Sequence, residues 1–116
     1  MDSLHSLNCQ VCRADTPTVS GAELETLLTQ IPDWALDRQD DVECLSRQFR
    51  FRNFREAFAF AGQIASLAEQ QDHHPALRIE WGSVVVYWWT HRIGGLHLND
   101  FIMAARTDRI AREAQG

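Results

Sequence analysis

Lysine is absent from this 116-residue sequence, and its 11 arginines are spread along the chain instead of clustered. The formal net charge is −5. Because surfaces that bind nucleic-acid phosphates need gathered positive charge, this pattern argues against nucleic acid as a partner. No apolar run approaches the roughly 20 residues of a membrane span, and residues 1–12 lack the basic start and apolar core of a secretory signal. We therefore expect a cytoplasmic protein with no membrane partner.

Cysteine is scarce as well, with Cys9, Cys12 and Cys44 as the three examples. Three thiols cannot form a paired disulfide framework, which agrees with a reducing compartment. Cys9 and Cys12 have the spacing of half a zinc site, but no second pair follows and His5 alone is a poor completion. We favour two free thiols in a flexible segment over a zinc site, with a redox pair as a further alternative.

The length and composition fit one soluble globular domain, with 45% hydrophobic and 23% charged residues. Residues 1–19 mix small and polar residues without a period, so we interpret them as a flexible N-terminal arm before a domain at residues 20–116. Alternating or β-prone runs predict two pairs of strands. They lie at residues 34–36 and 44–51, joined by a polar loop at residues 37–41, and at residues 77–81 and 84–90, joined by a tight turn.

Helix starts with capping-box spacing occur twice, at Ser20 with Glu23 and at Asn53 with Glu56. Apolar residues follow each start with helical spacing, and a third stripe follows the Gly94-Gly95 turn. The stripes are Leu24, Leu27, Leu28 and Ile31; Phe54, Phe58, Ala61, Ala65 and Ala68; and Met103, Ala104, Thr107, Ile110 and Ala111.

The last predicted strand is apolar on both faces. Val84, Val86 and Trp88 share one face, and Val85, Tyr87 and Trp89 share the other. A strand of this kind is typically covered on both sides, yet the helices of a small domain can cover only one. The second face is therefore expected to serve as a subunit contact or as a ligand floor.

Three of the five histidines fall close together in the predicted order of elements: His73, His74 and His91. Pro75 restricts His74 to extended backbone, so the long helix should end at about His73. The partial negative charge at a helix C-terminus favours an imidazolium, and histidine has an unperturbed pKa of about 6.5. These positions suit a proton donor near neutral pH.

The histidines belong to a wider pattern that resembles the pterin-4a-carbinolamine dehydratase family in residue type and spacing. The resemblance covers residues of about 22 to 112 and implies an α/β (α+β) fold, a four-stranded antiparallel sheet with three helices packed on one face in the order α-β-β-α-β-β-α. It rests on Glu69-x3-His73-His74-Pro75, Trp81, Val84, Val86, Trp88, Thr90-His91, Gly95-Leu96 and Asp100, and upstream on Trp34, Arg47, Phe49, Phe51, Phe54, Ala57 and Phe58.

The resemblance implies a hydro-lyase that converts a 4a-hydroxytetrahydropterin to quinonoid dihydropterin and water, in tetrahydrobiopterin recycling. It implies a reduced pterin as substrate, no metal or other cofactor, a homo-dimer or homo-tetramer, and a functional link to an aromatic amino-acid hydroxylase. In this reading His73 and His74 transfer protons and His91 completes the cluster. Glu69, one helical turn before His73, is expected to hydrogen-bond that ring, and further supporting residues are Asp72, Trp89, Thr90 and Asp100.

The sequence departs from many relatives at Leu77, where they carry an aromatic residue, and at His97, where they carry a Ser or Thr helix cap. We expect a looser pocket wall from the first and a weaker cap from the second. Asp100 has the alternative role of an ordinary helix-start residue. Two other readings stay open: a metal protein that uses the three histidines, and a non-catalytic binding or dimerisation module of the same fold.

Overall fold

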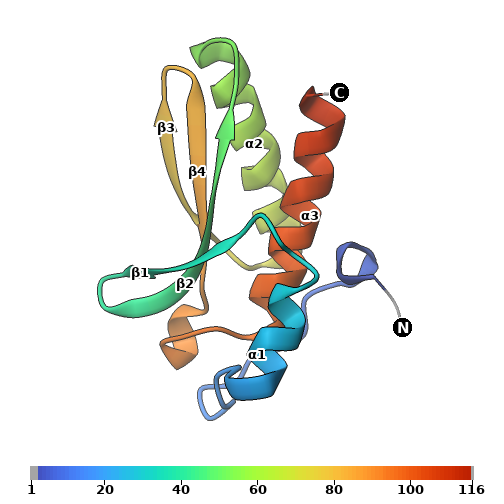
Figure 1. Cartoon of the computed structure of the whole chain (residues 1–116), viewed down its shortest axis with the longest axis vertical. Helices are drawn as coiled ribbons and strands as arrows, with labels where there is room; N and C mark the ends of the chain where they lie inside the picture. Colours follow the sequence, from blue (N-terminus) through green and yellow to red (C-terminus); the bar gives the residue numbers. More distant parts are fainter. Residues whose placement is uncertain (1–2, 116) are drawn as a thin grey trace.

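In the part of the chain that the structure describes, three α-helices and four strands follow one another in the predicted order, which confirms the fold class (Figure 1). The computed structural model describes residues 3–115. Helices α1, α2 and α3 span Gly21–Leu28, Phe54–Gln71 and Leu98–Gln115, and two short 3-10 helices, η1 and η2, span Leu4–Ser6 and His91–Ile93. Strands β1 to β4 span Ala35–Gln39, Val42–Arg50, Ala76–Glu80 and Ser83–Trp88.

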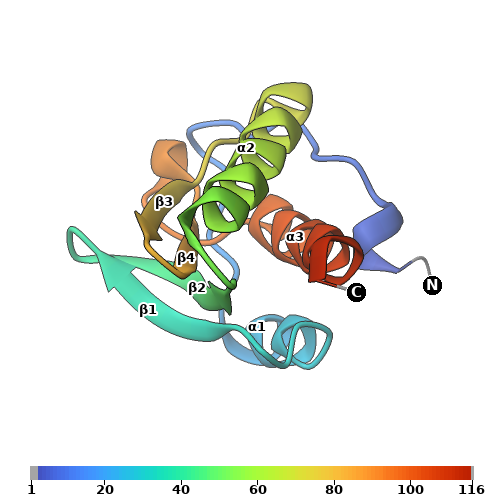
Figure 2. The same ribbon diagram turned by 90° about the horizontal axis from the view of Figure 1, so that it is seen from above.

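The sheet has the strand order β1-β2-β4-β3, and every neighbouring pair is antiparallel. All three α-helices lie on one side of it (Figure 2). In β4 the side chains of Val84, Val86 and Trp88 are completely buried beneath the helices, whereas Val85 and Tyr87 on the other face are only half-buried. The alternation predicted for this strand is therefore confirmed, and the chain itself leaves the second face partly open.

The β1–β2 connection is tighter than the predicted five-residue loop. Gln39 pairs with Val42, so only Asp40 and Asp41 form the turn, and both have left-handed backbone with φ of 51° and 64°. A two-residue turn with both residues left-handed matches the twist of a hairpin, and aspartate is among the residues that tolerate this conformation. The loop prediction was wrong because a run of polar residues does not distinguish an exposed edge strand from a loop.

The two predicted capping boxes have different outcomes. The Asn53 side chain accepts a hydrogen bond from the Glu56 amide at 2.9 Å, so the cap of α2 is confirmed. Ser20 precedes α1 as predicted but makes no side-chain capping bond.

Only part of the stripe predicted for α2 is buried: Ala61 and Ala68 lie in the core, whereas Phe54, Phe58 and Ala65 are exposed. Phe54 and Phe58 are 48% and 60% exposed, and their rings stack on each other with centroids 6.3 Å apart. Phe60 instead packs against Phe49 and Phe51 of the β2 region, with both ring centroids at 5.0 Å. Apolar residues occur with helical spacing on more than one face of this alanine-rich helix, so the spacing does not show which face is buried. The face that carries Phe60 packs on the sheet because Phe49 and Phe51 contact its ring. The buried residues are Ala57, Phe60, Ala61, Ile64, Leu67 and Ala68.

Helix α3 is held to the sheet by polar contacts as well as by its apolar stripe. Asp108 Oδ1 accepts hydrogen bonds from the Trp34 indole at 2.9 Å and from Arg47 Nη1 at 2.6 Å. Burial nevertheless raises the pKa of the Asp108 carboxyl above its ordinary value. Of the stripe predicted for α3, Ile110 is half-buried, and the buried members are Met103, Ala104, Thr107 and Ala111.

The described part of the predicted arm packs against the domain. Leu4 in η1 is buried, and Arg106 of α3 donates to the Leu7 carbonyl at 3.4 Å and to Asn8 Oδ1 at 3.1 Å. The predicted flexibility of residues 1–19 stays a prediction. None of the helices within residues 3–115 combines the length and apolar character needed to cross a bilayer.

Candidate active site

The end of α2 places the first two histidines. The helix stops at Gln71, two residues earlier than predicted, because Asp72 adopts left-handed backbone with φ of 51° and ψ of 43°. The amides of Asp72 and His73 both donate to the Ala68 carbonyl, which satisfies one of the free carbonyls of the last turn. The chain then turns away from the helix axis, so His73 points inward and its side chain is only 11% exposed, whereas the His74 side chain is 52% exposed.

The fully buried carboxylate of Asp100 joins the three elements that meet at the site. Its Oδ1 lies 2.6 Å from His73 Nε2, after α2. Its Oδ2 accepts hydrogen bonds from Thr90 Oγ1 at 2.8 Å, after β4, and from the His97 amide at 2.9 Å, before α3. No buried side-chain nitrogen or oxygen among the described residues lacks a hydrogen-bond partner. Asp100 is therefore both the helix-start residue of α3 and the partner of His73.

His97 caps α3 with its ring, and the weaker cap expected at this position stays a prediction. The Asn99 amide donates to His97 Nδ1 at 2.9 Å, while the His97 amide donates back to Asp100 Oδ2. This is the reciprocal arrangement of a capping box with an imidazole in place of a hydroxyl. Burial chiefly lowers the pKa of His97, with nearby His73 lowering it further against the opposing effect of Asp100. A neutral ring is what the cap requires, because a protonated Nδ1 cannot accept.

Glu69 contacts His74 and not His73, contrary to prediction. The Glu69 Oε2 atom and the His74 Nε2 atom form a hydrogen-bonded pair at the surface. The four-residue spacing of Glu69 and His73 brings side chains together only within a continuous helix, and the left-handed Asp72 interrupts α2 between them. The result is two separate histidine–carboxylate pairs, one buried and one exposed.

Two tryptophans hold the rings of His73 and His91. The buried Trp88 ring lies almost parallel to that of His73, with centroids 5.8 Å apart and an interplanar angle of 12°. Trp89 contacts His91 at the start of η2, with centroids 4.6 Å apart. Trp88 is the last residue of β4 and Trp89 follows it directly, so these neighbouring tryptophans contact histidines from two different elements.

One cavity of about 320 Å³ contains the three predicted histidines together. Asp72 and Thr90 also line it, while Asp100 lies behind His73, Glu69 beside His74 and Trp89 beside His91. The sequence did not predict the other residues that line this cavity. Residues 9–12 were interpreted as part of a flexible arm outside the domain, so nothing indicated that they would reach the histidines. The missed lining residues are Cys9, Gln10, Val11, Cys12, Gln71, Arg92 and Asn99.

This geometry provides acid–base chemistry. His73 lies at the cavity wall with its Nε2 on a buried carboxylate, and a carboxylate so placed fixes the orientation of the ring. His74 has the same kind of partner in a solvent-exposed setting. Among residues 3–115, no three His, Cys, Asp or Glu side chains are grouped so that they could hold a metal ion.

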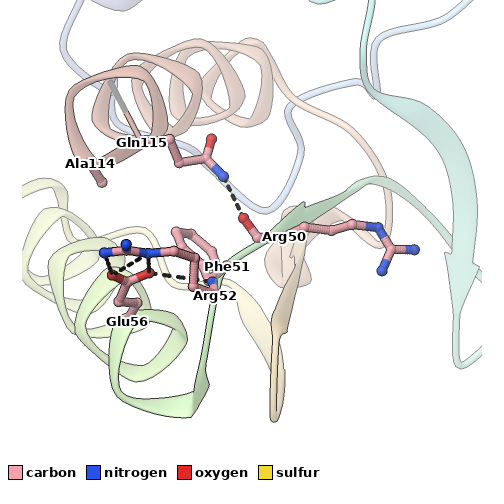
Figure 3. A pocket seen from close by; sticks show the side chains of 6 residues that line it. All are labelled: Arg50, Phe51, Arg52, Glu56, Ala114 and Gln115. Atoms are coloured by element: carbon pink, nitrogen blue, oxygen red, sulfur yellow. Dashed lines mark hydrogen bonds and ion pairs between the residues drawn. The ribbon is translucent and has the colours of Figure 1, made fainter.

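A second pocket, of about 380 Å³, lies at the opposite ends of α2 and α3 (Figure 3). It is lined by an Arg52–Glu56 ion pair and by Gln115, which donates to the Arg50 carbonyl at 2.6 Å. Its lining offers no histidine, cysteine or hydroxyl group. The histidine cavity, although slightly smaller, is therefore the candidate active site.

Comparisons with known proteins show which family the sequence matches. A sequence model of the family described as Pterin 4 alpha carbinolamine dehydratase matches residues 17–110. Two curated bacterial proteins, both provisionally named pterin-4-alpha-carbinolamine dehydratase, are similar over 110 residues, or 95% of this chain. The protein of Saccharophagus degradans is 53% identical with 97% of its own length covered, and that of Marinobacter nauticus is 54% identical with 99% covered.

Solved structures show the same fold. A crystal structure from Brucella melitensis, described as a transcriptional coactivator/pterin dehydratase, superposes with a TM-score of 0.72 at 32% identity, covering 82% of this chain and 99% of that one. A pterin dehydratase-like protein described as a RuBisCO assembly factor in the alpha-carboxysome gives a TM-score of 0.57 at 22% identity, covering 68% and 89%. At that identity the second likeness concerns the fold alone.

Proposed function

Since the chain belongs to the pterin-4a-carbinolamine dehydratase family, we propose that it removes water from a 4a-hydroxytetrahydropterin and releases quinonoid dihydropterin. The observation that carries this proposal is the single cavity lined by His73, His74 and His91, with the buried Asp100 carboxylate on His73. We place the reaction in tetrahydrobiopterin recycling, with a functional link to an aromatic amino-acid hydroxylase. The cytoplasmic location expected from the sequence also stays a prediction.

The reaction needs two proton transfers. Hydroxide is a poor leaving group, so the C4a–O bond breaks readily only when an acid protonates the oxygen as it departs. The hydrogen on N5 leaves as a proton to a base, and the N5 electron pair forms the new double bond to C4a. His73 and His74 carry out these two transfers in our proposal, because each has a ring nitrogen on a carboxylate and both line the cavity.

The remaining residues position these groups and the substrate. Thr90 donates to Asp100 Oδ2 and so fixes the carboxylate that orients His73. His91 and Trp89 form a contacting ring pair beside the cavity, which supports a role in orienting the flat pterin ring. Asp72 lines the same cavity and is assigned a supporting role.

Assembly into a homo-dimer or homo-tetramer is part of the proposal. Val85 and Tyr87 lie half-buried on the sheet face away from the helices, and an apolar surface of this kind is commonly covered by a partner. The alternative function, a non-catalytic binding module, draws its support from the exposed rings of Phe54 and Phe58 on α2 and of Trp81 in the β3–β4 turn.

A direct assay separates the two functions. A 4a-hydroxytetrahydropterin is generated in the assay mixture, and its spontaneous loss of water is followed by absorbance with and without the protein. A dehydratase accelerates the loss in proportion to protein concentration. If the protein leaves the spontaneous rate unchanged, the catalytic proposal is wrong and the binding module is favoured.

A further inference from the structure

The N-terminal arm reaches into the candidate active site. The arm segment, residues 8–12, lies close to the end of α2, to η2 and to the start of α3 (Figure 2). These are the same elements that carry His73, His91 and Asp100. The segment is thus positioned by the framework that positions the proposed catalytic groups.

Asn99 makes the most specific contact with this segment. The Gln10 amide donates to Asn99 Oδ1, and Asn99 Nδ2 donates to the Gln10 carbonyl, both at 2.7 Å. One side-chain amide therefore satisfies both main-chain groups of a single residue, as a neighbouring strand would. With the arm in place, Asn99 is only 2% exposed, so the paired contact with Gln10 is largely shielded from water.

Two further side chains hold the segment on either side of Gln10. Gln71, the last residue of α2, accepts from the Cys9 amide at 2.8 Å and donates to Asn8 Oδ1 at 3.2 Å. Arg92 Nη1 donates to the Cys12 carbonyl at 3.0 Å. The contacts are made mostly to the main chain of the arm, so they fix its path with little dependence on its side chains.

The fixed segment closes one side of the histidine cavity. Residues 9–12 all line this cavity, whose volume of about 320 Å³ lies at the small end of the range of about 300–1,000 Å³ for small-molecule sites. We propose that residues 9–12 form a wall of the ligand-binding site, and that Asn99 is the positioning residue that holds this wall in place. The identity of the ligand, a reduced pterin, rests on the proposed function.

The chemistry of the wall suits an uncharged ligand. Burial, and next to it the Asp100 carboxylate, raises the pKa of the Cys9 thiol to about 11, so this thiol is neutral at physiological pH. The side chains of Gln10 and Val11 carry no charge, and Arg92, which is charged, donates one hydrogen bond to the Cys12 carbonyl. A neutral thiol does not attack an electrophilic quinonoid product, so Cys9 can lie against such a ligand without reacting with it.

The native cysteines report on this wall. Cys9 and Cys12 line the cavity, whereas Cys44 is completely buried in β2, where burial raises its pKa to about 11. The full chain is treated with iodoacetamide with and without saturating 7,8-dihydrobiopterin, and the modified cysteines are located by mass spectrometry. We expect the pterin to slow alkylation of Cys12 severalfold or more, while Cys44 stays unmodified in both samples.

The outcomes are distinguishable because pterin binding is measured separately by calorimetry. If the pterin binds without protecting Cys12 from alkylation, residues 9–12 do not form a wall of the binding site, and the proposed function still stands. Absence of binding overturns both. This measurement uses the wild-type protein, so it decides the question even if a variant fails to fold.

An Asn99→Ala variant tests the positioning role. Without pterin, Cys9 and Cys12 should be alkylated faster than in the wild type, because the arm is released; a residue that only touched the ligand would not produce this change. The dissociation constant for pterin and the KM should rise by about tenfold, as expected for loss of a buried hydrogen-bonded contact, with a smaller change in kcat. Asn99→Asp keeps the acceptor for the Gln10 amide and should be intermediate.

The matched control is Gln115→Ala. Gln115 is a side-chain amide on the same helix that likewise donates to a main-chain carbonyl of a distant segment, but at the far end of α3 (Figure 3). Its removal should change neither thiol reactivity nor pterin affinity. If Asn99→Ala also behaves as the wild type in both measurements, Asn99 does not position the wall.

Discussion

Asp100 Oδ1 lies 2.6 Å from His73 Nε2, although the two residues are 27 positions apart in the sequence. The carboxylate is completely buried and is held by Thr90 and by the His97 amide on its other oxygen. The pair therefore connects the end of α2 to the start of α3. It gives His73 an environment that the exposed His74–Glu69 pair does not share.

Replacing Asp100 by asparagine should lower the dehydration rate by on the order of 10–100-fold. The change keeps the size of the side chain but replaces the carboxylate oxygens that hold the His73 ring and the Thr90 hydroxyl in place. Asp108→Asn is the control, because it removes a carboxylate from the same helix whose partners are Trp34 and Arg47. Its kcat should equal that of the wild type, and an equal loss of kcat in both variants would contradict a specific role for Asp100.

His73→Ala and His74→Ala should each lower the rate by about 10²-fold or more, because positioned acid–base groups typically contribute about 10²–10⁴. Circular dichroism and thermal unfolding establish that each variant is folded. Glu69→Gln should have a smaller effect than either, since its side chain is 77% exposed and surface pairs interact weakly. Wild-type rates in both histidine variants would exclude these residues as proton carriers.

The His97 cap makes stability depend on pH. Its pKa is lowered in the folded protein, so the folded state binds fewer protons than the unfolded chain. The stabilisation is fully present above the unfolded pKa of about 6.5 and is lost as the pH falls through the folded value. In His97→Ser, whose hydroxyl can cap but does not titrate, the urea midpoint should fall less between pH 7.5 and pH 5. An identical fall in both proteins would mean that His97 does not contribute.

The open face of the sheet predicts self-association. Tyr87→Lys should dissociate the assembly, because a charge buried at a contact without a partner is costly. Phe58→Lys, on the outward face of α2, is the comparison that distinguishes association through the sheet from association through the helix. Sedimentation equilibrium at micromolar concentration measures the mass: a wild-type species of 13.3 kDa, the mass of one chain, would refute the oligomer.

The sequence predicted the features that depend on local pattern. The alternation in β4 gave the correct buried face, and the Asn53 cap gave the start of α2. The partner of Glu69 was wrong because a single left-handed residue, Asp72, changes the direction of every side chain after it. Local spacing does not reveal such a break.

The missed parts of the site are long-range contacts. Gln10 and Asn99 are 89 positions apart, and neither belongs to a recognisable motif. The Nδ1 atom of His97 accepts the capping hydrogen bond only when the ring is neutral. Burial favours the neutral ring, and this burial exists only in the folded chain. Strong periodicity thus predicts elements, whereas the pairing of isolated polar side chains between elements requires the three-dimensional arrangement.

The double variant His73→Ala/His74→Ala tests the central claim most directly, because it removes both proposed proton carriers and excludes substitution of one ring for the other. Its dehydration rate is compared with that of the wild type under single-turnover conditions with a freshly generated 4a-hydroxytetrahydropterin. We predict that the wild type accelerates the reaction strongly and that the folded double variant approaches the spontaneous rate. A double variant that retains wild-type acceleration would contradict catalysis by this histidine pair.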